Sequence, residues 1–259
     1  MHVSLLSTLS SSSPTTAWVR DALATLGHDV DLVEHPDLAA ADAAQVGHQL
    51  ADSWLARRPD VVLALGWVAG LAATVAAREQ PVRLAVRLPR PGRGEPAVVR
   101  VEAALARGAD LVLTPTPTDR EALVRIGAPR ARVHLLPEAV DASAYASLAL
   151  NPGDPVVATR DDDASVHDLL VAMASGRAAV VASHGSLPDL VVDDVTGIVV
   201  PDGDDLAATA RALRGDPLRR DAMGLAAADR VAACYDTAVV ATVLARLLEQ
   251  TPTGTPAAA

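Results

Sequence analysis

Lysine and phenylalanine are both absent from this chain of 259 residues, and cysteine occurs only once. Without lysine, Schiff-base chemistry and the phosphate-binding lysine of a P-loop are excluded. The single cysteine, Cys234, excludes an internal disulfide and a thiolate zinc cluster, and is typical of a cytoplasmic protein. With two Tyr and three Trp as the only aromatic residues, the core must be built from Ala, Val and Leu.

The charge balance of the chain is acidic. Its 22 basic residues are all arginine and face 32 Asp and Glu, which gives a formal net charge of -10 and a pI near 5.0. Phosphate contacts dominate the affinity of nucleic-acid binders, so such proteins usually carry the opposite field. We therefore expect no nucleic-acid partner, and no binding to acidic lipid for the same reason.

The longest uncharged run extends from Val61 to Ala77. It is shorter than the roughly 20 apolar residues of a spanning helix, and Gly66 and Gly70 interrupt it. Buried parallel strands also read as continuous apolar runs. The run therefore predicts a buried strand at Val61–Leu65 that turns at Gly66 into an Ala-rich helix, without stable membrane insertion.

The N-terminal half alternates short β-rich runs with helical stretches, which is the pattern of a doubly wound parallel sheet. The expected strands are Val3–Leu9, Val30–Glu34, Val61–Leu65, Val82–Leu88, Leu111–Thr114 and Val133–Leu136. The expected helices are Thr15–Leu26, Ala43–Arg57, Trp67–Arg78, Pro96–Arg107 and Asp119–Ile126.

A linker-like cluster at Asn151–Pro155 precedes a second, shorter alternation. Its expected strands are Val156–Thr159, Val180–Ser183 and Ile198–Val200, and its helices Ser165–Ser175, Asp204–Arg214, Pro217–Tyr235 and Thr237–Gln250. We expect an α/β protein with an N-terminal domain over residues 1–145, a C-terminal domain over 146–250 and an unstructured tail over 251–259. Two such Rossmann-like units would face a ligand cleft at the carboxyl ends of their strands.

Metal and cofactor signals are weak. The glycine-rich dinucleotide fingerprint is missing, and seven scattered histidines give no zinc-ligand spacing. The run Asp161–Asp163 can hold a divalent cation or cap a following helix, and both readings stand at this point. We expect neither a metal nor a cofactor.

Two stretches have the composition of an anion site. Arg87, Arg90, Arg93 and Arg100 follow or end the strand Val82–Leu88, where guanidinium groups match phosphate oxygens, although a solvated arginine loop has the same sequence. Ser10–Ser13 with Thr15 and Thr16 lie at the start of the first helix, where hydroxyls and free amides either hold a phosphate or cap the helix.

The stretch Gly185–Leu206 and its continuation Asp216–Gly224 resemble the carboxyl-half signature of family 4 retaining, nucleotide-sugar-dependent glycosyltransferases. The N-terminal half agrees with that family in segments beginning at Pro59, Gly66, Val101 and Arg132. The resemblance implies a GT-B fold, in which two Rossmann-like domains face a cleft. It also implies metal-independent transfer of a sugar from a nucleotide-sugar donor to an acceptor that the sequence does not identify.

The family's Glu-x7-Glu motif stands ahead of an Ala-Met-Ala-x-Gly stretch, which Ala172–Gly176 matches. The resemblance therefore places the first Glu at Asp163, as catalytic residue, and the second at Val171, which cannot accept a hydrogen bond from the donor ribose. The remaining expected substrate-binding residues are Ser165, Val166 and His167 for the sugar, Arg87, Arg90 and Arg160 for the diphosphate, and Gly185 and Ser186.

Other departures from the family concern the donor diphosphate. The family's Arg and Lys early in the C-terminal domain have no counterpart, because too few residues separate Asp141 from the strand Val156–Thr159. The C-terminal Rossmann-like unit is thus expected to be truncated. Each missing charge-assisted hydrogen bond removes about 1.5–3 kcal/mol from donor binding. An Arg at position 87 replaces the family's His, and Ser10–Ser13 replace its glycine-rich loop.

Three hypotheses follow. The first is a shortened family 4-like glycosyltransferase. The second is a non-catalytic relative that serves as a binding or partner subunit, since an incomplete sheet leaves surface for a partner chain or a homo-oligomer. The third is an unrelated two-domain small-ligand binder, which the signature around Pro188 and Gly197 disfavours.

Overall fold

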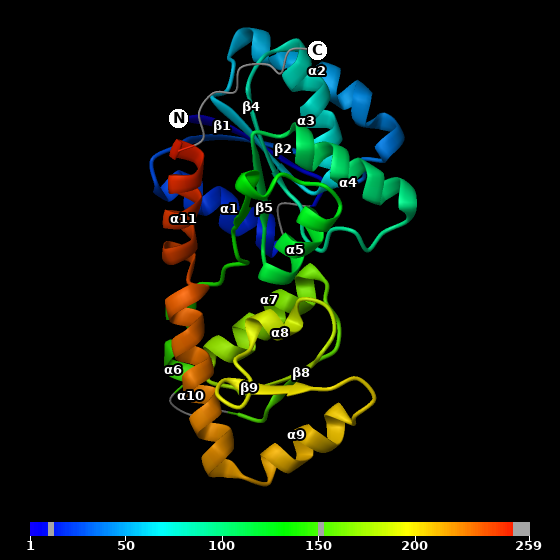
Figure 1. The fold of residues 1–259 in the computed structure, drawn as a ribbon. Helices are drawn as coiled ribbons and strands as arrows, with labels where there is room; N and C mark the ends of the chain where they lie inside the picture. Colours follow the sequence, from blue (N-terminus) through cyan, green and yellow to red (C-terminus); the bar gives the residue numbers. More distant parts are fainter. Residues whose placement is uncertain (10–12, 150–152, 251–259) are drawn as a thin grey trace. The chain divides into compact units, whose positions relative to one another are not determined.

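The computed structural model describes residues 1–9, 13–149 and 153–250, which form two compact units (Figure 1). Unit 1 comprises residues 1–115, 119–136 and the chain from Ala241 onward, and unit 2 comprises residues 116–118 and 137–240. By this division residues 137–145, which the sequence analysis grouped with the N-terminal domain, pack with unit 2. The C-terminal helix packs with unit 1 from Ala241 onward, which is most of its length. The expected tail over 251–259 lies outside the described residues.

Unit 1 is built on a six-stranded parallel sheet in the order β2-β1-β3-β4-β5-β6. Its strands are β1 His2–Ser7, β2 Asp29–Glu34, β3 Val61–Leu65, β4 Arg83–Arg87, β5 Leu111–Thr114 and β6 Val133–Leu135. The order reverses at β1, which pairs with β2 on one side and β3 on the other. The sequence prediction of a doubly wound parallel sheet is confirmed, with strand ends displaced by one or two residues.

Helices connect these strands, as right-handed crossovers between parallel strands require. They are α1 Pro14–Thr25, α2 Ala43–Ala56, α3 Trp67–Glu79, α4 Pro96–Gly108 and α5 Pro117–Arg125, with the 3-10 turns η1 Ala40–Asp42 and η2 Arg130–Arg132. The last helix, α11 Thr237–Gln250, enters unit 1 at Ala241. Pro14 stands at the first position of α1, where its missing N–H leaves no bond unmade.

The uncharged run from Val61 is the centre of unit 1. All five residues of β3 are buried, and Gly66 turns the chain into α3 with a φ of 92°, a value that favours glycine. The predicted strand, glycine turn and alanine-rich helix are therefore confirmed. In the described part of the chain no helix is both long and apolar enough to cross a membrane.

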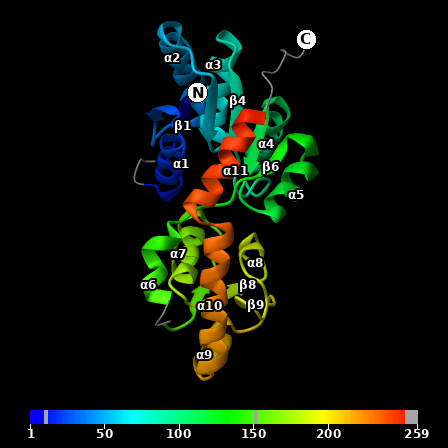
Figure 2. The same ribbon diagram turned by 90° about the vertical axis from the view of Figure 1, so that its left-hand side faces the viewer.

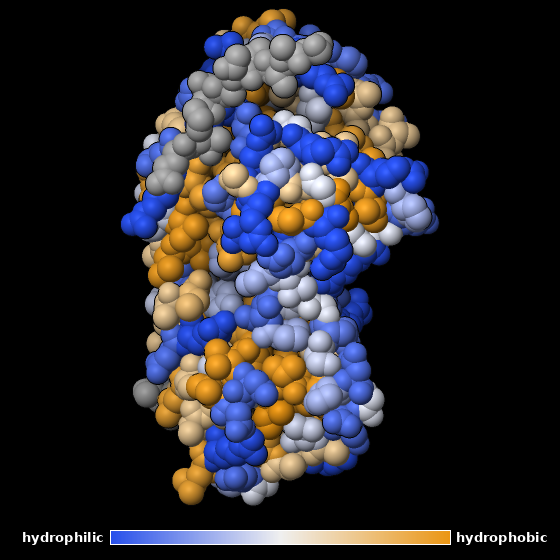
Figure 3. Space-filling model, viewed as in Figure 1, coloured by the Kyte–Doolittle hydropathy of each residue, from blue (hydrophilic) through white to orange (hydrophobic). Residues whose placement is uncertain are grey.

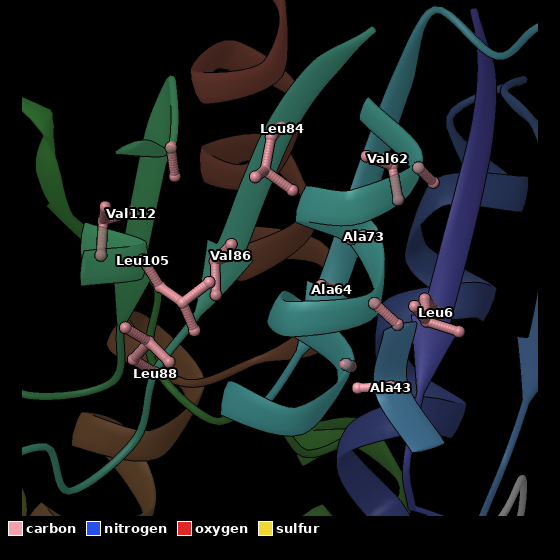
Figure 4. Packing of buried hydrophobic residues seen from close by; sticks show 14 of the residues in the cluster. Leu6, Ala43, Val62, Ala64, Ala73, Leu84, Val86, Leu88, Leu105 and Val112 are labelled. Atoms are coloured by element: carbon pink, nitrogen blue, oxygen red, sulfur yellow. The ribbon is translucent and has the colours of Figure 1, made fainter. Parts of the chain in front are cut away.

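The main core of unit 1 lies between the sheet and helices α2, α3 and α4 (Figure 4). Valine and leucine side chains of the strands, such as Val62, Val86 and Val112, face the helices. The fully buried positions of helix α3 are all alanine or glycine, and its larger residues Trp67 and Leu71 pack against the core in partly buried positions. Small side chains let the helix lie close to the sheet, as the composition predicted.

Unit 2 contains a three-stranded parallel sheet in the order β7-β8-β9, half the number of strands in unit 1. Its strands are β7 Val156–Ala158, β8 Ala179–Ala182 and β9 Gly197–Val200. Its helices are η3 Ala142–Tyr145, α6 Ala146–Ala149, α7 Asp163–Ala174, α8 Leu187–Leu190, α9 Leu206–Arg214 and α10 Pro217–Cys234. The short sheet agrees with the expected truncation of this unit.

Both faces of the small sheet are covered. One apolar cluster joins α7, α8 and α10 to the sheet through residues such as Leu170, Met173 and Val231. A smaller one joins α9 and Met223 to the opposite face. Helix α10 runs along the near side of unit 2 in Figure 2. Parallel sheets are stable only when both faces are buried, so even three strands need this double cover.

The two edges of the small sheet are blunted by different means. At β9, the carboxylate of Asp193 accepts the N–H of Val199 at 2.9 Å, and Asp194 N–H donates to Gly197 O at 2.8 Å. At β7, the strand is only three residues long and follows Pro155, which has no N–H. Charged groups and proline on edges disfavour pairing with another strand.

Candidate functional site

The carboxyl ends of β7, β8 and β9 meet at one edge of the sheet of unit 2, which is where α/β proteins bind ligands. Three loops leave this edge: residues 159–162 after β7, 183–186 after β8, and 201–205 after β9. They hold three of the nine predicted site residues, namely Arg160, Gly185 and Ser186, and four more lie in the first turns of helix α7, which begins at this edge. Hydrogen bonds join the loops to one another, so the edge has a defined shape without a ligand.

Asp161 joins the first loop to the second. Its carboxylate accepts hydrogen bonds from Ser186 N–H at 2.8 Å and from Ser186 Oγ at 2.6 Å. Ser186 is 2% exposed and precedes α8, while Gly185 before it has a φ of 72°. His184 Nε2 lies 3.2 Å from Thr159 O and adds a second tie. The predicted substrate residues Gly185 and Ser186 thus do lie at this edge, and Ser186 N–H already has an acceptor.

The second and third loops meet at Asp202. Ser183 Oγ donates to its Oδ1 at 3.1 Å, and His184 Nδ1 lies 3.6 Å from the same oxygen. His184 is therefore between the loops after β7 and β9. Both His184 and Asp202 are largely exposed, so this contact orients the loops more than it stabilises them.

Helix α7 begins at this edge and carries the expected catalytic residue. Asp162 is its N-cap and accepts the N–H of Ser165 at 2.8 Å, and this hydrogen bond holds the pKa of the Asp162 carboxyl below its usual value. The helix therefore starts at Asp163, two residues earlier than predicted. Of the two interpretations left open for Asp161–Asp163, the described contacts show capping by Asp162 and loop closure by Asp161. No described residues form a group of three metal-ligating side chains.

Asp163 is the first residue of α7 and is half-buried. The amides expected to bind the donor sugar follow it, but two of them are engaged. Ser165 N–H donates to the Asp162 carboxylate, and Val166 N–H donates to Asp162 O at 2.9 Å. Val166 is also buried, so it offers no polar group to a ligand. His167, half-buried and one turn from Asp163, is the third predicted residue in this turn.

Val171 lies eight residues beyond Asp163 on α7 and is part of the apolar packing of unit 2. It is half-buried and contacts the cluster that contains Leu170 and Met173. The position where the family resemblance places a ribose-binding carboxylate therefore faces apolar side chains in part. A side chain that accepts a hydrogen bond is missing here, as the sequence indicates.

The charge at this edge is strongly negative. The three loops and the first residue of α7 carry Asp161, Asp162, Asp163, Asp202, Asp204 and Asp205. Arg160 is the one arginine in the sequence of these loops. Its side chain is 80% exposed and donates to Asp162 at 2.8 Å. A diphosphate bound at this edge would meet more carboxylates than cations, which opposes its binding.

The other predicted arginines belong to unit 1. Arg87 is the last residue of β4 and is 2% exposed, so the interpretation as a solvated loop residue is wrong for this side chain. Arg90 lies in the following loop with a φ of 50°, and Arg93 Nη2 lies 3.5 Å from the buried carboxylate of Asp119. Arg100 is exposed on α4 and forms no part of the loop.

The arginine loop is anchored by a residue that the sequence analysis did not identify. Glu102 on α4 is 5% exposed, and its Oε2 accepts the N–H of Gly92 at 2.8 Å. Burial raises the pKa of the Glu102 carboxyl, and the hydrogen bond from Gly92 opposes that effect. Glu102 stands among the apolar positions of an amphipathic helix, and this pattern could have indicated that its carboxyl group is buried.

The serine-rich loop after β1 lies partly outside the described residues, which omit Ser10–Ser12. Ser13 is the N-cap of α1 but makes no side-chain cap hydrogen bond. Thr15 and Thr16 are buried, and Thr16 Oγ1 lies 2.9 Å from Ser7 Oγ at the end of β1. The described hydroxyls therefore tie the strand to the helix that follows it.

Helix α8 lies in the segment that carries the family resemblance, and two contacts fix it. Asp189 Oδ2 accepts the N–H of Thr118 at 2.9 Å. From α10, Arg230 donates to Leu190 O at 2.9 Å and to Asp189 O at 3.0 Å, and its guanidinium lies 5.7 Å from the Tyr235 ring centre. Burial raises the pKa of the Tyr235 hydroxyl. The sequence did not distinguish Arg230 from other helix arginines.

Several solved structures resemble this chain over nearly its whole length. The chain matches a sucrose-phosphate synthase from Thermosynechococcus elongatus with a TM-score of 0.72 and 15% identity, covering 96% of this chain and 98% of that one. HepE from Anabaena, solved with UDP and glucose, matches with a TM-score of 0.71 and 13% identity over 96% and 99%. The lipopolysaccharide outer core galactosyltransferase WaaB matches with a TM-score of 0.66 and 10% identity over 97% and 100%. No curated protein matches the sequence.

The fold is therefore that of the GT-B glycosyltransferases. Residues 35–139 match the family model of the glycosyl transferase 4-like domain, and these residues form much of unit 1. Residues 35–139 therefore resemble a glycosyl transferase 4-like domain, in agreement with the resemblance found in the sequence.

Proposed function

We propose that this protein transfers a sugar from a nucleotide-sugar donor to an acceptor, with unit 2 as the donor side and unit 1 as the acceptor side. The GT-B fold and the family 4-like domain support the class. The observation that carries the proposal is the position of Asp163. It stands at the start of α7, on the carboxyl edge of the sheet, beside loops that are already joined by hydrogen bonds.

In this mechanism catalysis rests on positioning and charge stabilisation, without a metal. Departure of the nucleoside diphosphate leaves positive charge on the sugar ring, and the Asp163 carboxylate stabilises this oxocarbenium-like state. The positive charge of the Arg160 side chain, at the same edge, stabilises the negative charge of the leaving diphosphate. Arg87 and Arg90 belong to unit 1. Replacing each of them with alanine and measuring the affinity for the diphosphate tests whether they also bind it. A cytoplasmic location remains a prediction from the single cysteine.

Calorimetric titration with nucleoside diphosphates and their sugar conjugates tests this proposal. The solved HepE structure contains UDP, so UDP and UDP-glucose are the first ligands, followed by the ADP and GDP series. One diphosphate should bind, and Asp163→Ala should weaken the sugar conjugate more than the bare diphosphate. Asp168→Ala is the matched control, because Asp168 is exposed on the same helix. Equal sugar-conjugate affinity in the wild type and Asp163→Ala would contradict the role of Asp163.

A second candidate function is that of a non-catalytic relative acting as a binding or partner subunit. Two observations favour it: Val171 stands where the resemblance expects a ribose acceptor, and carboxylates outnumber cations at the donor edge. If no nucleotide in the series binds at millimolar concentration to the folded protein, this second function replaces the first. A pull-down from the source cell would then be the next experiment.

A further inference from the structure

Helix α10 presents an apolar stripe to solvent on the side opposite its core contacts. Its buried face consists of residues such as Met223, Ala227 and Val231, which are at most 3% exposed. The outward stripe comprises Leu218, Ala222, Leu225, Asp229 and Ala232, all of them exposed. Leu218 is 86% exposed and Leu225 is 49% exposed. The spacing of the five residues alternates between four and three, which keeps them on one face of a helix.

Such spacing is the pattern of a helix that packs along a second helix. The hydrophobic effect favours removal of the two leucines from water, because each buried CH₂ contributes about 0.8 kcal/mol. Ala222 and Ala232 in the same stripe are small and allow two helix backbones to approach closely. Elsewhere on unit 2, Figure 3 shows hydrophobic residues gathered over the region of α8 and β9, where Val192 and Val195 are exposed. Those residues lie in a loop and lack helical spacing.

The charged residues of α10 favour α10 of a second copy of the chain as the partner helix. Asp229 is the one charged residue of the stripe, and Arg219 lies ten residues before it. If two copies of α10 pair in antiparallel orientation about the level of Gly224, each Asp229 lies opposite the other copy's Arg219. Parallel pairing would instead place Asp229 beside Asp229, which is unfavourable. The exposed ion pair between Arg219 and Asp194 in the single chain contributes little and can exchange for the new one.

We infer that α10 is the contact of a two-fold symmetric homodimer, in which the stripe of one copy packs antiparallel on the stripe of a second copy. A two-fold axis makes the contact self-complementary and closes the assembly at two chains. Two helices of 18 residues bury less than the roughly 1,200–2,000 Å² of a stable interface. The dimer is therefore weak and forms in the micromolar range. This inference does not depend on donor binding.

Sedimentation equilibrium over micromolar to millimolar concentrations is the first test. The weight-average mass of the wild-type protein should rise from one chain to two, and Leu225→Asp should hold it at one. Leu55→Asp is the matched control, because Leu55 is 70% exposed on α2 in unit 1 and should leave the dimer intact. A wild-type protein that stays monomeric throughout, or a Leu225→Asp variant that still dimerises, would overturn the inference.

Charge exchange and cross-linking test the orientation. Asp229→Arg should weaken the dimer at least tenfold, and Arg219→Asp in the same chain should restore it. In an antiparallel pair the two Cys234 residues lie about 30 Å apart along the helix axis. Mild oxidation should therefore leave the wild type unlinked and link the Leu225→Cys variant made in a Cys234→Ser background. Rapid linkage through Cys234 instead would show a parallel pair and refute the orientation.

Discussion

Asp161 and Ser186, 25 residues apart in the sequence, are joined by two hydrogen bonds that connect the loops after β7 and β8. Hydrogen bonds to a charged group contribute about 1.5–3 kcal/mol each, and Ser186 is buried. Asp161→Ala should therefore lower the free energy of unfolding of unit 2 by about 2 kcal/mol, as measured by chemical denaturation. Asp204→Ala, in the exposed loop after β9, should change it little. Equal stability of the two variants would show that the tie between the loops contributes nothing.

Helix α10 approaches the turn after α7 so closely that only glycine fits at position 224. A Cβ on Gly224 would overlap the carbonyl oxygen of Gly176. Gly224→Ala should destabilise unit 2 by about 3 kcal/mol, since backbone cannot yield as a side-chain tip can. Gly108→Ala is the control: a Cβ at that helix-end position has no atom within 4 Å, and the change should be neutral or stabilise by up to about 1 kcal/mol. Thermal unfolding of both variants measures the contrast.

Restoring the carboxylate that the family resemblance expects on α7 should strengthen nucleotide binding. Val171→Glu gives the donor ribose an acceptor for hydrogen bonds, which raises the affinity of a nucleoside diphosphate by about tenfold. Val171→Gln separates the hydrogen bond from the added charge, and Val171→Leu controls for altered packing against the apolar cluster. Calorimetry with the diphosphate of highest affinity compares the three. No gain with either polar side chain would mean that α7 does not face the ribose.

Burial of Glu102 makes the stability of unit 1 depend on pH in a definite direction. The folded-state pKa of Glu102 is raised above its ordinary value of 4.5, so protonation favours the folded state. Its stabilising contribution is complete below that ordinary value and is lost as the pH rises through the raised pKa. The stability of Glu102→Gln relative to the wild type should therefore increase from pH 4 to neutral pH. Denaturation at several pH values, with Glu95→Gln as an exposed control, checks this slope.

Much of the fold could be predicted because its signals are local. The buried run at Val61–Leu65 and the glycine at position 66 predicted the strand and the turn correctly, and the following helix with an error of one residue at its end. Short helices escaped prediction, since α8 has four residues and is fixed by distant partners, Thr118 and Arg230. The start of α7 was misplaced because three successive aspartates can each serve as a cap.

The candidate site was predicted less well than the fold, because its contacts join residues far apart in the chain. Nothing in the sequence near Asp161 indicates that its carboxylate binds Ser186, nor that Glu102 holds the amide of Gly92. Arg87 lay within the expected strand Val82–Leu88, but the sequence did not show that its side chain is buried at the end of β4. The contacts of a side chain at the end of a strand depend on which strands lie beside it, and a local sequence pattern does not predict the order of strands in a sheet.

The alanine-rich contact between α3 and the sheet makes the core's tolerance to substitution one-sided. Where a buried position carries a single methyl group, truncation leaves almost no cavity, and the loss in free energy stays small. Replacing such an alanine with a larger side chain has a large cost in free energy, because the helix and the sheet are close-packed. Each added methylene group must displace neighbouring atoms. Substitutions that accumulate in this core will therefore exchange small residues for one another, and the distance between helix and sheet will persist.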